Sequence, residues 1–241
     1  MAIEGSEAYD LLGGLYDIWC AEVDHDIAFY LAFCEGARDP VIELGAGTGR
    51  VAVELCRHGH VVIALDGSPP MLDAARRHAE RRGVSALLET VRADLRSPPP
   101  LGPAECVIAP FRTLMHLHDD EDCVHALTAA ATMLADDGRI VFDVFEPTPA
   151  DIRATEGKLL ERAGGVRERA RWDVERQLIM LEVLMPSTTA EMTLRWRTSE
   201  QWASIFERAG VVRRAAYAGF DGIPLRDRPG DQVYVLERRS S

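Results

Sequence analysis

Hydrophobic and polar positions change their spacing several times along the chain, and these changes predict its helices and strands. Short, almost uninterrupted apolar runs predict buried strands at 40–44, 60–66, 87–94, 106–109 and 139–145. Between them, apolar residues at helical spacing predict helices at 49–58, 69–82 and 119–134. Strands that alternate with helices are typical of a parallel sheet covered on both faces. The pattern therefore predicts an α/β fold with a doubly wound, Rossmann-like sheet.

Capping and breaking residues mark the ends of two predicted helices. Ser68 stands at a typical N-cap position, and the Pro-Pro pair after it fits the first helical turn. Gly83 is suited to ending that helix. Further along the chain, Ser199 is the predicted N-cap of a helix that runs to residue 209, with strands expected at 211–220 and 232–239.

The stretch from 146 to 197 breaks this alternation and predicts an antiparallel insertion, with strands at 169–174, 178–185 and 190–197. The spacing of 178–185 also fits a helix, but Pro186 and the polar residues after it favour a strand. An insertion after strand five lies over the carboxyl edge of the sheet, where ligands bind in such folds. Trp172 and Trp196 are candidates to stack on a flat substrate, with core packing as the other interpretation.

Residues 6–35 contain two Tyr-Asp pairs seven residues apart, followed by an amphipathic pattern at 26–33. One interpretation is a helical cap whose aromatic side chains cover the edge of the sheet. The other is a lid in which Tyr9 and Tyr16 close over a ligand. The sequence leaves both interpretations open.

Length and charge limit the possible functions. The 241 residues are enough for one substantial domain with an insertion, and no linker divides them. A net charge of −12 argues against a general nucleic-acid binder, which needs a basic surface. The five cysteines are scattered without C-x-x-C spacing, which indicates a reducing compartment and no structural zinc. With no apolar run of membrane-spanning length, we expect a cytoplasmic protein, monomeric or homodimeric, that contacts neither nucleic acid nor membrane.

Glycines are concentrated in the segment ELGAGTGR at 43–50, between the first strand and its helix. Glycine at such a turn lets the backbone approach a ligand closely. The second strand ends in Asp66, where doubly wound nucleotide-binding folds hold a ribose diol. A dinucleotide fingerprint, G-x-G-x-x-G, requires glycine at position 50, where this chain has Arg50. The observed G-x-G-x-G spacing, with Glu43 before it, indicates a different ligand.

Segment 43–50 resembles motif I of the class I S-adenosylmethionine-dependent methyltransferases. DGSPPML at 66–72 is similar to the segment after motif I in that family, VRADL at 91–95 to motif II, and LADDGR at 134–139 to the turn before strand five. The Tyr-Asp start, Phe111-Arg112 with His116-Leu117, and Phe220-Asp221-Gly222 resemble the small-molecule branch with an N-terminal helical cap.

The resemblance implies a seven-stranded mixed sheet, with its last strand antiparallel, and an antiparallel β insertion after strand five. It implies one domain with four parts: a helical cap at 1–38, a cofactor-binding core at 40–147, an insertion or lid at 148–197, and a C-terminal helix and strand pair at 198–241. The expected cofactor is S-adenosyl-L-methionine, which leaves as S-adenosyl-L-homocysteine.

The resemblance also implies roles for single residues. The three glycines of motif I would admit the methionine tail, Glu43 would hold its ammonium group, and Asp66 would accept both ribose hydroxyls. Met71 would lie against the adenine, although a core methionine is the other interpretation, and Asp94 with the Leu95 amide would read its polar edge. The implied cofactor residues are Tyr9, Glu43, Gly45, Ala46, Gly47, Gly49, Asp66, Gly67, Ser68, Met71, Ala93, Asp94, Leu95, Ala109 and Pro110.

The acceptor side is less well determined by the sequence. Tyr16 and His116 are the candidate catalytic residues, and the candidate substrate-binding residues are Tyr16, Arg112, His116, Glu146, Trp196 and Asp221. We expect His118 to lie on the surface. The H-x-H pattern at 116–118 has no third candidate ligand at a spacing typical of metal sites, so no metal is expected. Because no general base is compelling, we expect positioning for in-line methyl transfer to a nitrogen of a small molecule, a heteroaromatic or amino-sugar natural-product intermediate.

Three other functions remain open from the sequence. The chain could be an O-methyltransferase with His116 as general base. It could be a non-catalytic module that binds S-adenosylmethionine. A nicotinamide-dependent oxidoreductase is a third, more distant alternative.

Overall fold

The computed structural model of the protein describes residues 7–12, 16–21, 23–38, 40–186, 188–226 and 228–239. Parts of the expected cap, at 1–6, 13–15 and 22, lie outside these residues. Among the described helices, none is both long and apolar enough to cross a membrane.

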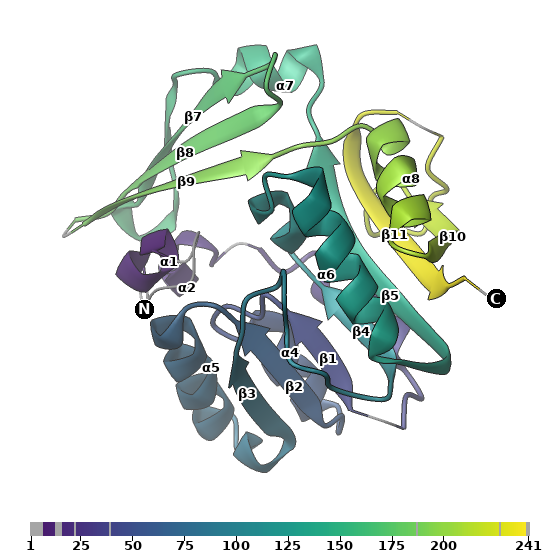
Figure 1. The fold of residues 1–241 in the computed structure, drawn as a ribbon. Coiled ribbons are helices and arrows are strands. Elements are labelled where there is room, and N and C mark those ends of the chain that lie inside the picture. The colour runs from purple at the N-terminus through teal and green to yellow at the C-terminus, as the bar shows by residue number, and fades with distance from the viewer. Residues whose placement is uncertain are drawn as a thin grey trace.

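The main sheet has seven strands in the order β10-β11-β5-β4-β1-β2-β3 (Figure 1). Neighbours from β3 to β5 are parallel, whereas β11 runs antiparallel to both β5 and β10. This arrangement confirms the predicted mixed sheet with its last strand antiparallel. The strands are β1 (Val41–Leu44), β2 (Val62–Asp66), β3 (Leu88–Arg92), β4 (Ala104–Ala109), β5 (Leu134–Glu146), β10 (Val211–Tyr217) and β11 (Gly230–Arg238).

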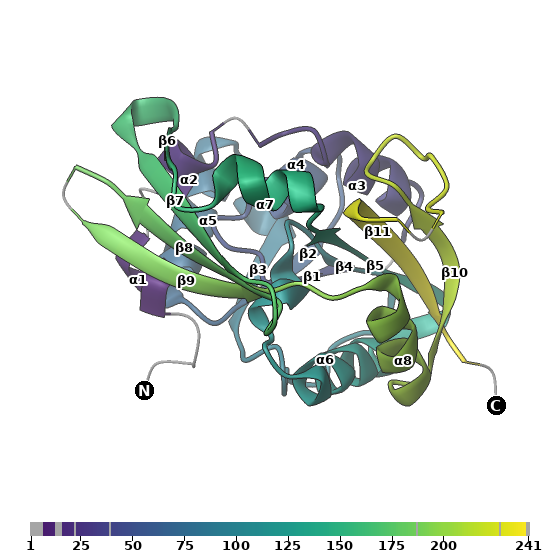
Figure 2. The same ribbon diagram turned by 90° about the horizontal axis from the view of Figure 1, so that it is seen from above.

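Helices cover both faces of this sheet, as the alternation predicts (Figure 2). On one face, α6 (Asp120–Thr132) and α8 (Ser199–Arg208) pack with strand residues such as Val107 and Phe142. On the other, α3 (Ile27–Cys34) and α4 (Arg50–Arg57) pack with residues such as Cys106 and Ile108. Successive residues of β4 therefore enter opposite cores, which is why its sequence is apolar without alternation. Helix α5 (Pro69–Arg81) packs beside β2 and β3.

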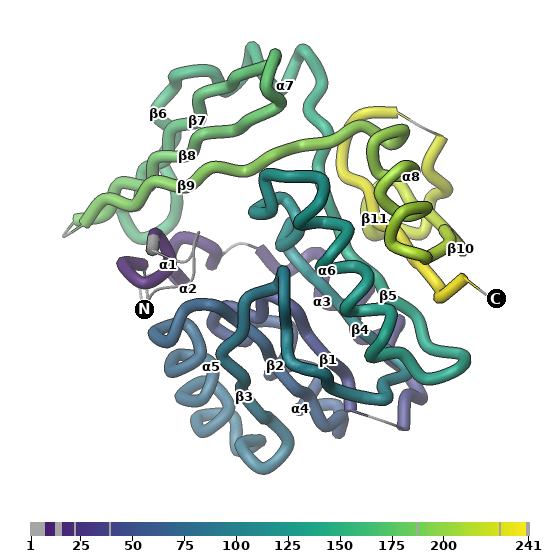
Figure 3. The backbone as a smooth tube through the Cα atoms, viewed as in Figure 1, coloured from purple at the N-terminus to yellow at the C-terminus, as the bar shows by residue number. Residues whose placement is uncertain are grey.

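The predicted insertion is a second antiparallel sheet, β6-β7-β8-β9, which Figure 3 shows beyond the carboxyl ends of the central strands. Its strands are β6 (Leu159–Glu161), β7 (Arg167–Asp173), β8 (Leu178–Leu184) and β9 (Thr189–Arg195). The strand interpretation of 178–185 is confirmed. The short strand β6 and helix α7 (Pro149–Thr155) were not expected from the sequence.

The cap helices α1 (Glu7–Leu12) and α2 (Tyr16–Trp19) lie between the two sheets (Figures 1 and 3). Leu12 of the cap is buried with Met71 of α5 and with Val183 and Met192 of the insertion. One small apolar core thus joins the cap, the insertion and the cofactor-binding core.

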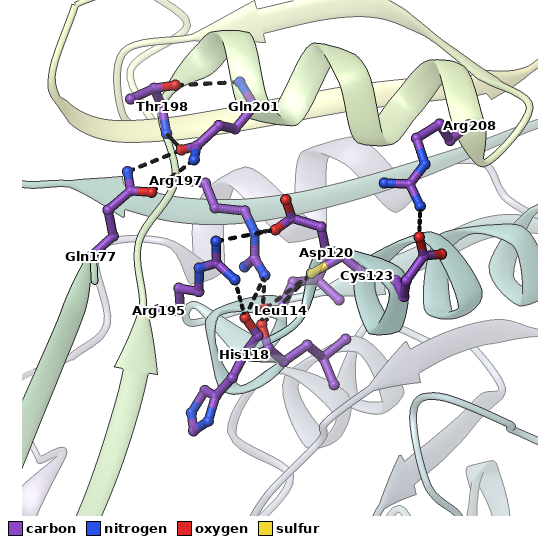
Figure 4. A network of polar contacts seen from close by, with 12 residues as sticks. Leu114, His118, Asp120, Cys123, Gln177, Arg195, Arg197, Thr198, Gln201 and Arg208 are labelled. Carbon is purple, nitrogen blue, oxygen red and sulfur yellow. Dashed lines mark hydrogen bonds and ion pairs between the residues drawn. The ribbon is translucent and has the colours of Figure 1, made fainter. Parts of the chain in front are cut away.

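Arg197 anchors the return of the insertion to the main core (Figure 4). Its side chain is fully buried, donates from Nε to Asp120 at 2.8 Å, and donates from NH2 to the Leu117 carbonyl at 2.9 Å. Neighbouring Arg195 donates to the His118 carbonyl. The insertion is therefore fastened to the segment directly after His116.

The predicted N-cap position of Ser68 is confirmed for α5, although its hydroxyl donates to Asp10 at 2.6 Å and makes no side-chain cap. Two other local predictions were wrong in detail. Helix α8 is capped by Thr198 rather than Ser199, since the Thr198 hydroxyl accepts from the Gln201 amide in a reciprocal capping box. The turn expected at 136–138 is an irregularity within β5, which begins at Leu134.

Candidate functional site

A cavity of about 480 Å³ lies at the carboxyl ends of β1, β2, β3 and β4. The strand order reverses between β1 and β4, which is the switch point where doubly wound folds bind ligands. The cavity is lined by Tyr9, Tyr16, Gly45, Gly47, Asp66, Gly67, Ala93, Asp94, Leu95, Arg96, Pro110, Phe111, Thr113, His116, Leu117, His118, Asp119 and Asp122.

The glycine turn brings bare backbone to the wall of this cavity. Gly45, Gly47 and Gly49 have φ values of +67°, +55° and +79°, which favour glycine. A Cβ at Gly45 would lie 2.4 Å from Thr113 Cγ2, so packing also excludes any larger residue at that position. A Cβ at Gly47 would meet no described atom within 4 Å, because Gly47 faces the cavity. Gly47 therefore leaves room for a ligand atom against the backbone.

Asp66 is held in place at the end of β2 by backbone donors. The Gly47 and Ser68 amides each donate to a different carboxylate oxygen of Asp66 at 2.8 Å. A carboxylate has about four acceptor positions, so capacity remains for the two hydroxyls of a ribose. Burial raises the pKa of Asp66 above its ordinary value, and the amide donors oppose that rise.

Asp94 also lines the cavity, but its carboxylate already has a partner. Arg96 donates to it from Nε at 3.0 Å and from NH2 at 2.6 Å, and this pairing lowers the pKa of Asp94. The sequence did not identify Arg96, which lines the same end of the cavity. Ala93 and Leu95 lie beside it, where the resemblance expects the adenine.

Glu43 lies beneath the turn and outside the cavity lining. It is 2% exposed, and its Oε2 has no hydrogen-bond partner within the described part of the chain. Burial raises the pKa of Glu43 to about 8. The expected contact of Glu43 with an ammonium group, directly or through water, stays a prediction.

Arg50 stands where a dinucleotide motif has glycine, and its side chain pairs with a residue of the cap. Its guanidinium donates to both Asp26 oxygens at 2.6 Å, and the Asp26 side chain is buried. This bidentate pair ties the first turn of α4 to the start of α3.

Two tyrosines and a histidine also line the cavity. The Tyr9 hydroxyl lies 2.9 Å from His116 Nε2 and 3.4 Å from Met192 Sδ, and the Tyr9 and Tyr16 rings meet edge to face. Burial lowers the pKa of His116 to about 4, so its imidazole is neutral at pH 7. Burial raises the pKa of both tyrosines, so their hydroxyls are protonated.

The aspartates of the two Tyr-Asp pairs fasten the cap to the cofactor-binding core. Asp10 accepts the Ser68 hydroxyl at 2.6 Å, directly beside Asp66. Asp17 accepts the Thr48 hydroxyl at 2.6 Å and lies 2.9 Å from His78 Nε2. In each Tyr-Asp pair, the tyrosine therefore lines the cavity and the aspartate binds a hydroxyl of the segments that border it. This shared arrangement accounts for the repeat.

Several expected site residues lie outside the cavity lining. Met71 is buried in the small core shared with the cap, which supports the core interpretation of that residue. Trp196 is partly buried and packs against the main apolar core, as Trp172 does, which supports the core interpretation of both. Arg112 pairs with Asp231 at 3.2 Å, Glu146 accepts from Gln232, and Asp221 borders a different surface hollow. The cavity lining also lacks Ala46, Gly49, Ser68 and Ala109.

Phe111 and Thr113 belong to the cavity wall and were missed as individual residues. They lie in the loop at 110–118, which the sequence marks by its place after strand four and by the resemblance at Phe111-Arg112. Neither signal assigned Phe111 or Thr113 to the site.

Known proteins resemble this chain in sequence and fold. Residues 41–138 match the family model described as a methyltransferase domain. The demethylmenaquinone methyltransferase of Thermus thermophilus is 35% identical over 118 residues, which are 48% of this chain and 51% of that protein. The chain spans about half the length of the curated relatives it matches.

Solved structures extend the likeness over the whole fold. The CcbJ methyltransferase from Streptomyces caelestis superposes with a TM-score of 0.86 at 23% identity, covering 99% of this chain and 100% of that one. The sugar N-methyltransferase KedS8 from Streptoalloteichus sp. superposes with a TM-score of 0.69 at 18% identity, covering 100% and 97%.

The cavity agrees with the ligand of this family. It has a bare backbone position at Gly47, a carboxylate with free acceptor capacity at Asp66, and a position at the switch point of the sheet. Together with the match of residues 41–138 to a methyltransferase domain, the sheet topology and the glycine turn, this gives the chain the fold of the class I S-adenosylmethionine-dependent methyltransferases.

Proposed function

We propose that the protein transfers the methyl group of S-adenosylmethionine to a nitrogen of a small molecule, a heteroaromatic or amino-sugar natural-product intermediate. The observation that carries the proposal is the mixed lining of one cavity. The glycine turn and Asp66 line it together with Tyr9, Tyr16 and His116. A cavity of about 480 Å³ is of the size that small-molecule ligands occupy.

Backbone and carboxylate groups of this lining would hold the cofactor. Gly45 and Gly47 would admit its amino acid tail, Asp66 would accept its ribose hydroxyls, and Ala93 and Leu95 would border its adenine. When bound, the cofactor supplies a methyl group that its sulfonium has already activated. The chain's own residues then need to orient the acceptor and exclude water. Alignment of this kind can contribute about 7–11 kcal/mol to lowering a barrier.

The state of His116 supports transfer by positioning. A histidine whose pKa is about 4 is a weak base at pH 7, and its Nε2 is already within hydrogen-bond distance of Tyr9. Protonated tyrosines and a neutral imidazole form a wall without net charge, which suits a neutral amine or ring nitrogen. The structurally similar KedS8 is described as a sugar N-methyltransferase, which supports the same class of acceptor.

The decisive experiment is a labelled-methyl assay with panels of amines, heterocycles and phenols, beside calorimetry with S-adenosylhomocysteine. We expect S-adenosylhomocysteine to bind and label to appear on amines or heterocycles. Label on phenols alone would replace the proposal with O-methylation. Binding without transfer to any acceptor would indicate a non-catalytic module, and no binding at all would revive the nicotinamide alternative.

His116→Gln separates a general base from a positioning residue. A general base contributes about 10²–10⁴-fold to a rate. We expect kcat to fall by less than that range, with S-adenosylhomocysteine affinity unchanged. His125→Gln, on the exposed side of α6, is the matched control.

A further inference from the structure

We infer that Asp143 is a positioning residue that holds the cavity loop at Pro110–Thr113 in a strained shape, and that ligand binding depends on this shape. The inference rests on the proposed function, because it concerns the same cavity. No feature of the sequence singled out Asp143, which lies within β5 and is 5% exposed.

The loop has an unfavourable backbone at two consecutive positions. Phe111 and Arg112 have φ values of +55° and +61°, although both carry a Cβ. L-residues other than glycine rarely adopt this left-handed region, and two in succession require support from the surroundings. The support must come from outside the loop, since neither residue is a glycine or an asparagine.

Asp143 supplies that support with both of its oxygens. Its Oδ1 accepts the Phe111 amide at 2.7 Å, and its Oδ2 accepts the Arg112 amide at 3.0 Å. Two successive backbone N–H groups that converge on one anion form a nest. Tyr30 of α3 donates its hydroxyl to Oδ1 at 2.6 Å and thereby fixes the carboxylate from behind.

The loop shape determines the wall of the cavity. Phe111 lines it, and Thr113 packs so closely that a Cβ at Gly45 would lie 2.4 Å from its Cγ2. The Thr113 hydroxyl donates to the Pro110 carbonyl at 2.7 Å, which closes the loop on itself. The 3-10 helix η3 (Thr113–His116) follows the loop and ends at His116, which also lines the cavity. Asp143 is thus connected, through two amides, to the segment that supplies Phe111, Thr113 and His116 to the cavity wall.

Rescue by glycine tests this inference without an acceptor. Asp143→Asn leaves one acceptor oxygen for two amides, so we expect the Kd for S-adenosylhomocysteine to rise about tenfold. Arg112→Gly removes the Cβ that makes the left-handed backbone unfavourable, so the double variant D143N/R112G should regain most of that affinity. D143N/R112A is the matched control, because it loses the same arginine but keeps the Cβ; we expect no recovery. Tyr30→Phe should change the Kd by less than about twofold, since both loop amides keep their acceptor.

Calorimetry gives the Kd and thermal unfolding gives the Tm of each variant. Equal Kd values for wild type and D143N, or for the glycine and alanine double variants, would overturn the inference. If D143N alone does not fold, the Kd values of the glycine and alanine double variants are still compared with each other. Failure of both double variants to fold would also count against the inference. Should the wild type not bind S-adenosylhomocysteine, the proposed function fails, while a higher Tm for D143N/R112G than for D143N/R112A still tests the role of Asp143.

Discussion

Replacing Gly47 by alanine gives a direct test of where the ligand lies. The added methyl group would meet no described protein atom within 4 Å, so the protein itself has room for it. The space that it would enter is the cavity beside Asp66. If the cofactor lies against this backbone, Gly47→Ala should affect binding far more than folding.

The expected magnitudes follow from the backbone and from the contact. Alanine at φ +55° costs about 1–2 kcal/mol in the folded state, part of which is offset by the smaller entropy of the unfolded chain. For a chain of this length, a net loss of about 1 kcal/mol lowers the Tm by about 2–4 °C. Overlap of the new methyl group with a ligand atom costs about 2–3 kcal/mol. The Kd for S-adenosylhomocysteine should therefore rise about 30- to 150-fold.

Gly83→Ala separates backbone strain from ligand contact. Gly83 follows α5, has a φ of +71°, and likewise has no described atom within 4 Å of an added Cβ, but it lies outside the cavity lining. Both variants should lose similar amounts of Tm in thermal unfolding, and only Gly47→Ala should lose affinity in calorimetry. Equal affinities for the two variants would refute the assignment of the turn as the cofactor contact.

Two further predictions concern the buried carboxyl and the cap. The folded-state pKa of Glu43 is raised from 4.5 to about 8, so the protonated form is favoured by folding, and its contribution to stability is lost as pH rises from about 4.5 through 8. The free energy of unfolding, measured from pH 5 to 8.5, should therefore fall more for the wild type than for Glu43→Gln, and parallel curves would contradict this. Asp17→Asn weakens the hydrogen bond from the Thr48 hydroxyl and should lower kcat/KM about fivefold. The exposed cap variant Asp24→Asn should leave kcat/KM unchanged. Equal losses in the two variants would show that the Asp17–Thr48 hydrogen bond does not position Tyr16.

The fold and the cofactor half of the site follow largely from local sequence. Apolar runs, helical spacing and glycine positions report on backbone geometry within a few residues. Because parallel strands bring their carboxyl ends to one edge, Gly47, Asp66 and Leu95 could be placed together before their contacts were known. The expected roles of these residues toward the cofactor remain predictions for the binding experiments.

Where local rules compete, the sequence is less decisive. Thr198 and Ser199 are both good N-cap residues, and the capping box with Gln201 selects the first. Met71 fits either an adenine contact or a core position by spacing alone. Its burial against Leu12 and Val183 depends on how the cap and the insertion pack over α5, which periodicity does not describe.

The contacts of Tyr9, His116 and Asp143 depend on tertiary structure. Tyr9 and His116 meet across 107 residues, and Asp143 reaches the loop amides from a neighbouring strand. A sequence shows which side chains can donate or accept hydrogen bonds, but packing decides which of them meet and how far burial shifts their pKa values. The glycine turn and the strand ends thus indicated a methyltransferase fold from the sequence. Only the folded chain revealed the neutral wall of Tyr9, Tyr16 and His116, and the strained loop that Asp143 holds.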